Sequence, residues 1–178
     1  MTRSVTPSIR AAVLVPVFRR EDGDLRVVLV RRGTLGPHGG ELAFPGGKCE
    51  PGDASLLATA LREAREEVGL APDQVELLAE LPPVDTLVTG YLIFPFLARI
   101  VPPQAWRIQA GEIAEVIETR VRDLDRPEAR GTDVIRLAAK SDPQPIAFFR
   151  VGPHRLWGAT FRILEPLVSR LLAGEWRV

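Results

Sequence analysis

Three glutamates, Glu63, Glu66 and Glu67, follow a glycine-rich turn at Gly46-Gly47. Positions i, i+3 and i+4 of a helix share one face, and like charges at this spacing cost roughly 0.2–0.5 kcal/mol per pair. Hard divalent cations take oxygen ligands, and Mg²⁺ combines carboxylates with waters and substrate phosphates. The spacing therefore predicts a helix that holds a divalent metal against an anionic substrate. The alternative is a solvated helix face on which neighbouring arginines neutralise the acids.

The residues around these glutamates have helical periodicity. Asp53 or Ser55 is expected to cap the helix start, and Gly69 is suited to end the helix. We expect a helix over about residues 55–68, with the glutamates on a face away from its apolar stripe. That stripe consists of Leu57, Ala60, Leu61, Ala64 and Val68.

The order of these residues resembles the Nudix hydrolase signature, Gly-x5-Glu-x7-Arg-Glu-U-x-Glu-Glu-x-Gly-U, in which U is a bulky aliphatic residue. The matching residues are Gly47, Arg62, Glu63, Glu66, Glu67, Gly69 and Leu70. Asp53 stands where Glu is usual, eight residues separate it from Arg62, and Ala64 is small for the first U position. The resemblance implies a single domain over residues 1–178, with the signature box at 47–70. It also implies an α/β fold in which a mixed sheet has helices on both sides, the Nudix-type α/β/α sandwich.

The first half of the box is similar to one branch of this family, the coenzyme A pyrophosphatases. Their pattern is Phe-Pro-Gly-Gly-x-x-Asp-x-x-Asp-x-Ser-x3-Thr-Ala-Leu-Arg-Glu, and the eight-residue spacing is typical of it. The chain matches it with Phe44-Pro45-Gly46-Gly47, Asp53, Ser55 and Thr59-Ala60-Leu61-Arg62-Glu63, and deviates at Glu50. The run at 154–164 also resembles the branch's Ile-Trp-Gly-x-Thr-Ala segment.

The coenzyme A signature of that branch, which precedes the box, is matched only in part. Arg31, Gly40 and Phe44 to Gly47 match it, whereas Leu29, Arg32 and Gly36 stand at its Thr, Ser-or-Ala and second Arg positions. The planar guanidinium of arginine can donate two parallel hydrogen bonds to a phosphate, and few other side chains can do this. Hydrolysis of a nucleoside diphosphate derivative is therefore a firmer expectation than coenzyme A as the particular substrate.

The resemblance implies a metal-dependent pyrophosphohydrolase, with cleavage of coenzyme A to 4′-phosphopantetheine and 3′,5′-ADP as one possible reaction. ADP-ribose, dinucleoside polyphosphates and nucleoside triphosphates are the alternative substrates. A different class of function is a non-catalytic nucleotide-binding Nudix module. Catalytically inactive relatives would be expected to lose a box glutamate, so the presence of Glu63, Glu66 and Glu67 favours an enzyme.

The resemblance also assigns roles to individual residues. Glu63, Glu66, Glu67 and the Gly47 carbonyl would hold Mg²⁺ or Mn²⁺, and Arg62 would orient the glutamates. The general base is left open among Glu63, Glu112 and Glu115. Asp53 would make a stabilising or water-mediated contact, or simply cap the helix. The substrate-binding candidates are Arg31, Arg32, His38 and Phe44.

Composition predicts a globular enzyme that acts on a small molecule. The chain has 178 residues, 46% of them hydrophobic, with 23 basic and 23 acidic side chains. This balance provides no broad basic surface for nucleic acid or acidic membrane. The single Cys49 and the polar residues 1–10 indicate a cytoplasmic protein. Trp176 is compatible with a homodimer contact.

Apolar runs separated by turn residues predict alternating strands and helices. Strands are expected at 11–18, 26–32, 41–44, 75–81, 91–101, 114–121 and 146–151, and a second helix at about 160–173. Pro95 suggests an edge strand or a bulge, and Pro166 a kink or a late helix start. The segment 122–132 has no clear pattern, and the loop at 33–40 is expected to lie near the box.

Overall fold

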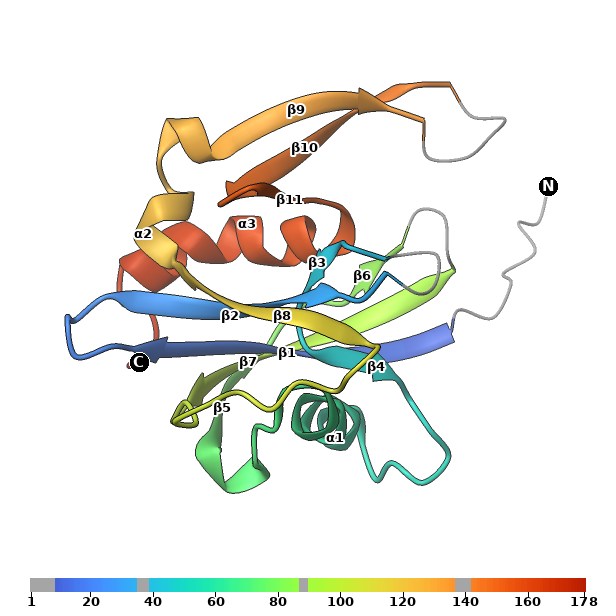
Figure 1. Cartoon of the computed structure of the whole chain (residues 1–178), viewed down its shortest axis with the longest axis vertical. Coiled ribbons are helices and arrows are strands. Elements are labelled where there is room, and N and C mark those ends of the chain that lie inside the picture. Colours follow the sequence, from blue (N-terminus) through green and yellow to red (C-terminus); the bar gives the residue numbers. More distant parts are fainter. Residues whose placement is uncertain (1–8, 35–38, 87–89, 137–141) are drawn as a thin grey trace.

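A mixed sheet lies between helix α1 (Leu56–Val68) on one face and helix α3 (Gly158–Leu172) on the other (Figure 1). The computed structural model describes residues 9–34, 39–86, 90–136 and 142–178. The expected α/β fold, with a helix on each side of a mixed sheet, is confirmed.

The long strands of this sheet pair in both directions. Strand β1 (Ile9–Arg19) runs antiparallel to β2 (Leu25–Arg32) and parallel to β7 (Tyr91–Ile100). β7 is flanked on its other side by β5 (Val75–Glu80), and β2 pairs with β8 (Ile113–Arg120), both antiparallel. These strands form the platform on which α1 lies.

The Gly46-Gly47 segment, which was expected to form a turn, lies in one of several short strands before α1. β1 and β2 pair only at the hairpin end, between Val17–Arg19 and Leu25–Val27. Beyond it, β3 (Leu42–Ala43) pairs with β2 and β4 (Gly46–Lys48) pairs with β1. The predicted strand at 41–44 is therefore shorter than expected, and a further strand follows it. The two glycines lie within β4, directly beside β1.

A second sheet of three strands stands on the α3 side (Figure 1). The segment 122–132, which had no clear pattern, forms the end of α2 (Val121–Leu124), the 3-10 turn η2 (Pro127–Ala129) and the start of β9. The second sheet comprises β9 (Arg130–Ile135), β10 (Gln144–Val151) and β11 (His154–Leu156). The remaining short elements are β6 (Val84–Asp85), which pairs with β7, and the 3-10 turn η1 (Pro72–Gln74) after α1.

The hydrophobic core consists of two clusters, one on each face of the sheet. Val15, Val27 and Leu29 pack toward α3, whereas Leu14 and Val28 pack toward α1. Neighbouring strand residues point to opposite faces, so a continuous apolar strand can serve both helices.

For each proline, one of the two predicted alternatives is wrong. α3 begins at Gly158 and continues through Pro166, so a late start is wrong. Proline inside a helix costs ~3 kcal/mol, and the apolar face of α3, which includes Leu164 and Leu167 at 2% exposure or less, offsets this cost. β7 is not an edge strand, because it pairs with β1 on one side and with β5 and β6 on the other. Pro95 lies opposite the break between β5 and β6, where Leu81 N–H donates to its carbonyl at 3.0 Å.

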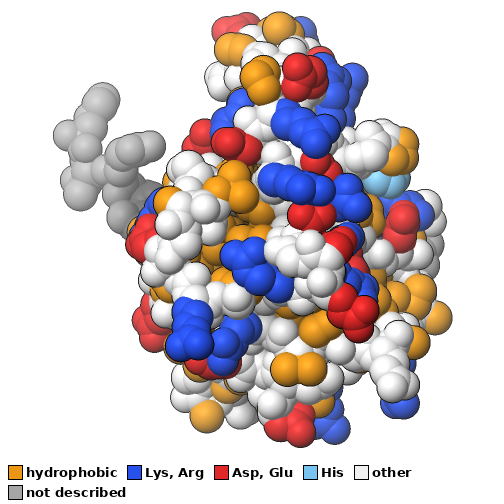
Figure 2. Space-filling model, turned by 90° about the vertical axis from the view of Figure 1, so that its left-hand side faces the viewer, with side chains coloured by type: hydrophobic (Ala, Val, Ile, Leu, Met, Phe, Trp, Pro, Cys, Tyr) orange, Lys and Arg blue, Asp and Glu red, His pale blue; other side chains and the backbone are white. Residues whose placement is uncertain are grey.

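The surface agrees with the balanced composition. On the side that carries α2, Lys and Arg side chains are interspersed with Asp and Glu (Figure 2). No helix among the described residues is long and apolar enough to cross a membrane. Trp176 packs against the core on the α3 side, with the Arg170 guanidinium 4.6 Å from its ring centre, so its side chain has an intramolecular role.

Candidate active site

Helix α1 starts and ends at the residues that the sequence indicated. Ser55 is the N-cap, and its Oγ accepts a hydrogen bond from the Ala58 N–H at 3.0 Å. Gly69 ends the helix in the left-handed conformation, at φ 73°, and its N–H donates to the Arg65 carbonyl. Of the two N-cap candidates, Asp53 is thus the one that does not cap, which leaves its carboxylate free for other contacts.

The three box glutamates differ in exposure. The side chains of Glu63 and Glu66 are 16% and 52% exposed, whereas Glu67 is only 3% exposed. The alternative of a solvated acidic face is therefore wrong for Glu67, which is buried. α1 packs against β1 and β4, and this contact covers the Glu67 side of the helix.

Gly46 and Gly47 bring the backbone of β4 against these carboxylates. Gly46 N–H donates to Glu67 Oε2 at 3.0 Å. A Cβ at Gly47 would overlap the carboxylate of Glu63, and one at Gly46 would overlap the Ala12 carbonyl. Only glycine allows this close approach of strand and helix.

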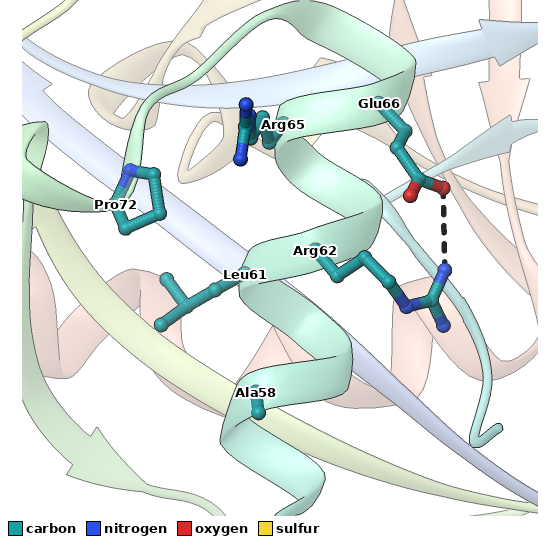
Figure 3. Close-up of a pocket in the computed structure, with 6 residues that line it drawn as sticks. All are labelled: Ala58, Leu61, Arg62, Arg65, Glu66 and Pro72. Carbon is teal, nitrogen blue, oxygen red and sulfur yellow. Dashed lines mark hydrogen bonds and ion pairs between the residues drawn. The ribbon is translucent and has the colours of Figure 1, made fainter. Parts of the chain in front are cut away.

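Arg62 connects the loop before α1 to the glutamates. Its Nε and Nη2 donate to the two carboxylate oxygens of Asp53 at 2.9 and 3.1 Å, and Nη2 also donates to the Lys48 carbonyl at 3.2 Å. Its Nη1 lies 3.0 Å from Glu63 Oε1 and donates to Glu66 Oε2 at 3.2 Å. Arg62 and Glu66 point to the same side of α1, whereas Arg65 points toward Pro72 (Figure 3). Of the two arginines that could neutralise the acids, Arg62 is the one that contacts them.

Asp53 is held from three directions. Besides Arg62, the Thr59 hydroxyl donates to its Oδ2 at 2.8 Å and the Glu50 N–H at 2.9 Å. The Arg62 hydrogen bonds, followed by those from Glu50 and Thr59, keep the pKa of Asp53 well below its usual range. In turn, Asp53 raises the pKa of Arg62. Both groups therefore stay charged, and their geometry is fixed by a bidentate pair.

Burial has the opposite effect on the glutamates. Desolvation raises the pKa of Glu67 to about 7, against the hydrogen bond from Gly46. Desolvation also raises the pKa of Glu63, against the attraction of Arg62. Two adjacent carboxylates with little solvent are unfavourable as anions, and a nearby cation would favour their charged forms.

The donor set fits a hard divalent cation. Carboxylate oxygens and a strand carbonyl beside Gly47 are the ligand types that Mg²⁺ and Mn²⁺ take. In the described part of the chain, no three Asp, Glu, His or Cys side chains converge on one point as a ready-made metal cluster. Glu63 and Glu66 instead both contact the Arg62 guanidinium.

Of the two later acids proposed as a base, the structure brings Glu112 toward the glutamates. The segment that carries it is bound to the end of α1, where Gln109 N–H donates to the Glu67 carbonyl at 3.0 Å. The charge of Glu112 raises the pKa of both Glu63 and Glu67. Glu115 instead accepts from Arg31 Nε at 3.1 Å and lies 3.8 Å from His154 Nε2.

The substrate-binding candidates that the structure describes, Arg31, Arg32 and Phe44, do not lie together. The charge of Arg32 lowers the pKa of Glu67, so Arg32 lies on the α1 side, whereas its neighbour Arg31 is bound to Glu115. Phe44 is 3% exposed within the core on the α3 side, which leaves its ring no surface for a substrate. His38 and Gly36 lie outside the described residues.

Sequence reasoning missed several contacts that build the site. Thr59 was only a motif match, yet it is fully buried and holds Asp53. The backbone groups of Lys48 and Gln109 have no signature in the sequence. One residue type in the sequence could have indicated these contacts. Thr59 carries a hydroxyl four residues after the N-cap Ser55, and this hydroxyl faces the loop before α1.

Comparisons with known proteins show the family and the fold. A family model described as the NUDIX domain matches residues 8–135. A Cronobacter sakazakii protein named "Uncharacterized Nudix hydrolase NudL" is 45% identical over 182 residues, which cover 96% of this chain and 87% of the relative. Two solved structures share the fold. The NUDIX domain of Shewanella oneidensis NrtR complexed with ADP ribose has a TM-score of 0.59 at 20% identity, covering 93% of this chain and 90% of that chain. A MutT/nudix family protein from Enterococcus faecalis has a TM-score of 0.60 at 19% identity, covering 98% and 64%.

Proposed function

We propose that this chain, which belongs to the Nudix hydrolase family, is a Mg²⁺- or Mn²⁺-dependent hydrolase that cleaves the diphosphate linkage of a nucleoside diphosphate derivative. One observation carries the proposal. Glu63 and Glu67 lie with little solvent against the Gly46-Gly47 backbone, while Arg62, fixed by Asp53, contacts Glu63 and Glu66. A merely solvated acidic face would not bury one carboxylate and leave a second only 16% exposed.

In the proposed reaction, water attacks one phosphorus and the bridging oxygen leaves with the other phosphate, so two phosphate monoesters form. When bound, Mg²⁺ or Mn²⁺ neutralises phosphate charge and lowers the pKa of water. Glu63, Glu66, Glu67 and the Gly47 carbonyl would hold the metal. Arg62 positions the carboxylates and does not contact the substrate, because Asp53, Lys48 and the glutamates engage its three nitrogens.

We assign the general base to Glu112. Its charge acts on both Glu63 and Glu67, and the backbone of its segment is fixed to two places. Gln109 N–H binds the end of α1, and Gly33 N–H donates to the Glu112 carbonyl at 2.6 Å. Glu115 is the second candidate, but Arg31 and His154 engage its carboxylate. A base must reach the attacking water, and a carboxylate held by Arg31 is less available for that contact.

Coenzyme A is the substrate we propose to test first, with 4′-phosphopantetheine and 3′,5′-ADP as products. Arg32, whose charge lowers the pKa of Glu67, supports an anionic substrate beside the box, whereas Arg31 is paired with Glu115. The absence of an arginine at Gly36 keeps ADP-ribose, dinucleoside polyphosphates and nucleoside triphosphates as alternatives. The two core clusters share one sheet, which supports a single domain, and the lone Cys49 suits a cytoplasmic enzyme.

A substrate panel tests the proposed function. Coenzyme A, ADP-ribose, diadenosine polyphosphates, NADH and nucleoside triphosphates are incubated with Mg²⁺ or Mn²⁺, and products are identified by mass. Release of 4′-phosphopantetheine and 3′,5′-ADP supports the coenzyme A assignment. Cleavage of a different member keeps the chemistry and removes that assignment. No cleavage by folded protein that binds metal would favour the non-catalytic binding module.

A further inference from the structure

The loop before α1 is joined to the helix through the carboxylate of Asp53. Residues 50–53 form a turn, in which the Asp53 N–H donates to the Glu50 carbonyl at 3.0 Å and the Glu50 N–H donates to Asp53 Oδ2 at 2.9 Å. The turn residues Glu50, Pro51 and Gly52 are exposed. Because their side chains do not pack into the core, the place of the turn depends on what Asp53 binds on the helix.

Thr59 provides the rigid end of this connection. Its side chain is fully buried, and its Oγ1 lies 2.8 Å from Asp53 Oδ2 and 3.3 Å from the Ser55 carbonyl. A hydroxyl has one proton to donate. The closer, charged carboxylate is the stronger acceptor, so the proton goes to Asp53. Only one torsion separates Oγ1 from the helix backbone, and β-branched side chains are stiff about it.

Arg62 cannot supply the same fixed point. Its bidentate contact sets the guanidinium relative to Asp53, but the side chain between that group and the helix is long, has many rotamers and is 24% exposed. Thr59 and Arg62 stand three residues apart, on one face of α1. The short side chain therefore holds Asp53 against the helix, and Asp53 in turn holds the guanidinium that meets Glu63 and Glu66.

We propose that Thr59 is a positioning residue for the metal site. Its hydroxyl, through Asp53 and Arg62, keeps Glu63 and Glu66 in the arrangement that binds a divalent cation. The proposal rests on the proposed function, because that function requires the metal. Thr59 itself contacts neither metal nor substrate, since its side chain is fully buried. The hydroxyl has this role, and the methyl group serves only packing.

Mn²⁺ binding to the full chain, measured by electron paramagnetic resonance without substrate, tests the proposal. Thr59→Val keeps the branched shape but has no donor. Partners that orient metal ligands typically contribute 10- to 100-fold in affinity, and we expect the valine variant to bind Mn²⁺ about tenfold more weakly. Thr59→Ser keeps the hydroxyl and should bind Mn²⁺ like the original chain, although the lost methyl group lowers its Tm.

Nuclear magnetic resonance of the metal-free chain follows the same connection without any metal. The Arg62 Nε–H group donates to Asp53 Oδ1 at 2.9 Å, so its signal reports the place of the guanidinium. Thr59→Val should shift this signal, and Thr59→Ser should not. Thr59→Ala is a second variant without the hydroxyl, and alanine is the residue that most favours a helix. It should show the same changes as Thr59→Val.

Thr119→Val is the matched control. Thr119 lies on β8 opposite Val27, on the α3 side of the sheet, and its buried hydroxyl has no hydrogen bond to any described residue. This variant makes the same chemical change far from the acidic face of α1. It should leave both Mn²⁺ binding and the Arg62 signal as they are in the original chain.

A double-mutant cycle tests whether Thr59 acts through Asp53. Two residues in one hydrogen-bond network are not additive when both are replaced. In an Asp53→Asn background, Thr59→Val should therefore weaken Mn²⁺ binding much less than it does in the original chain. An equal loss in both backgrounds would show that Thr59 acts by another route, and would overturn the proposal.

The remaining outcomes separate this proposal from the function on which it rests. Weak Mn²⁺ binding by Glu66→Gln together with unchanged binding by Thr59→Val would overturn the role of Thr59 and leave the proposed function standing. Equal binding by Glu66→Gln and the original chain would remove the metal site, and this proposal with it. A loss in Thr59→Ser as large as that in Thr59→Val would assign the effect to packing and overturn the role of the hydroxyl.

Discussion

Arg62 and Asp53 form a bidentate ion pair between helix α1 and the loop that precedes it, with Nε to Oδ1 at 2.9 Å and Nη2 to Oδ2 at 3.1 Å. Two parallel hydrogen bonds fix the plane of the guanidinium as well as its position. Its third nitrogen then faces Glu63 and Glu66. The position of the loop therefore determines, through Arg62, where Glu63 and Glu66 lie, and we propose that these two residues bind metal.

Replacement of Arg62 by lysine should lower activity while the fold is kept. A lysine ammonium preserves the charge but cannot bridge both oxygens of Asp53 and still reach the glutamates. Residues that orient metal ligands typically contribute 10- to 100-fold, so we expect Arg62→Lys to lose about that factor in kcat. A metal titration of activity should shift to higher concentration. An effect on KM alone would instead indicate contact with the substrate.

The Asp53–Arg62 pair should also make stability depend on acid pH. The folded-state pKa of Asp53 lies below its usual value of 3.8, so its contribution is complete above that value and is lost as pH falls through the folded pKa. Asp53→Asn should therefore lower Tm at neutral pH, and the difference in Tm should shrink as the pH falls below about 3.8. Thermal melts at several pH values measure this. A difference that stays constant with pH would assign the effect to lost packing.

Gly47→Ala should disturb the site without unfolding the core. The added Cβ overlaps the Glu63 carboxylate, which must move. A displacement of about 1 Å near reacting groups can cost about a hundredfold in rate, and we expect a loss of that size. Gly52→Ala is the control, because a Cβ there meets no atom within 4 Å. Equal activity of the two variants would contradict the close approach of β4 to α1.

Glu112→Gln and Glu115→Gln should differ in their effect on turnover. A general base contributes typically 10²–10⁴-fold, so Glu112→Gln should lose about a hundredfold or more in kcat. Glu115→Gln should retain most activity, because its carboxylate is engaged by Arg31. The reverse result would move the base to Glu115.

The box helix and the positions of the long strands could be anticipated from the sequence because both depend on local patterns, whereas the order of the strands in the sheet was not predicted. The apolar stripe from Leu57 to Val68 located α1 to within a residue at each end, and the alternating runs located the long strands. The burial of Glu67 could not be read this way. The sequence places Glu67 on the polar side of the helix. The side chain is buried because β4 packs against α1 there, and the Gly46 N–H of β4 donates a hydrogen bond to it.

Other parts of the site depend on contacts between distant segments. Glu112 and Glu115 are equivalent in sequence, and they separate only because Gln109 binds the end of α1 while Arg31 binds Glu115. Phe44 is next to the glycine turn in sequence but faces the core on the α3 side. The expected loop role of His38 lies outside the described residues and stays a prediction.

The central claim is that the acidic face of α1 exists to hold metal for hydrolysis, and Glu66→Gln tests it most directly. Glutamine is nearly isosteric, and the side chain is 52% exposed, so stability should change by no more than about 0.5 kcal/mol. Glu128→Gln, at another exposed glutamate, is the matched control. With the substrate found by the panel and saturating Mg²⁺, we predict that Glu66→Gln loses turnover by orders of magnitude while Tm stays close to that of the control. Full activity of Glu66→Gln would remove this residue from the metal site, and loss of the fold would show that the acidic face is structural.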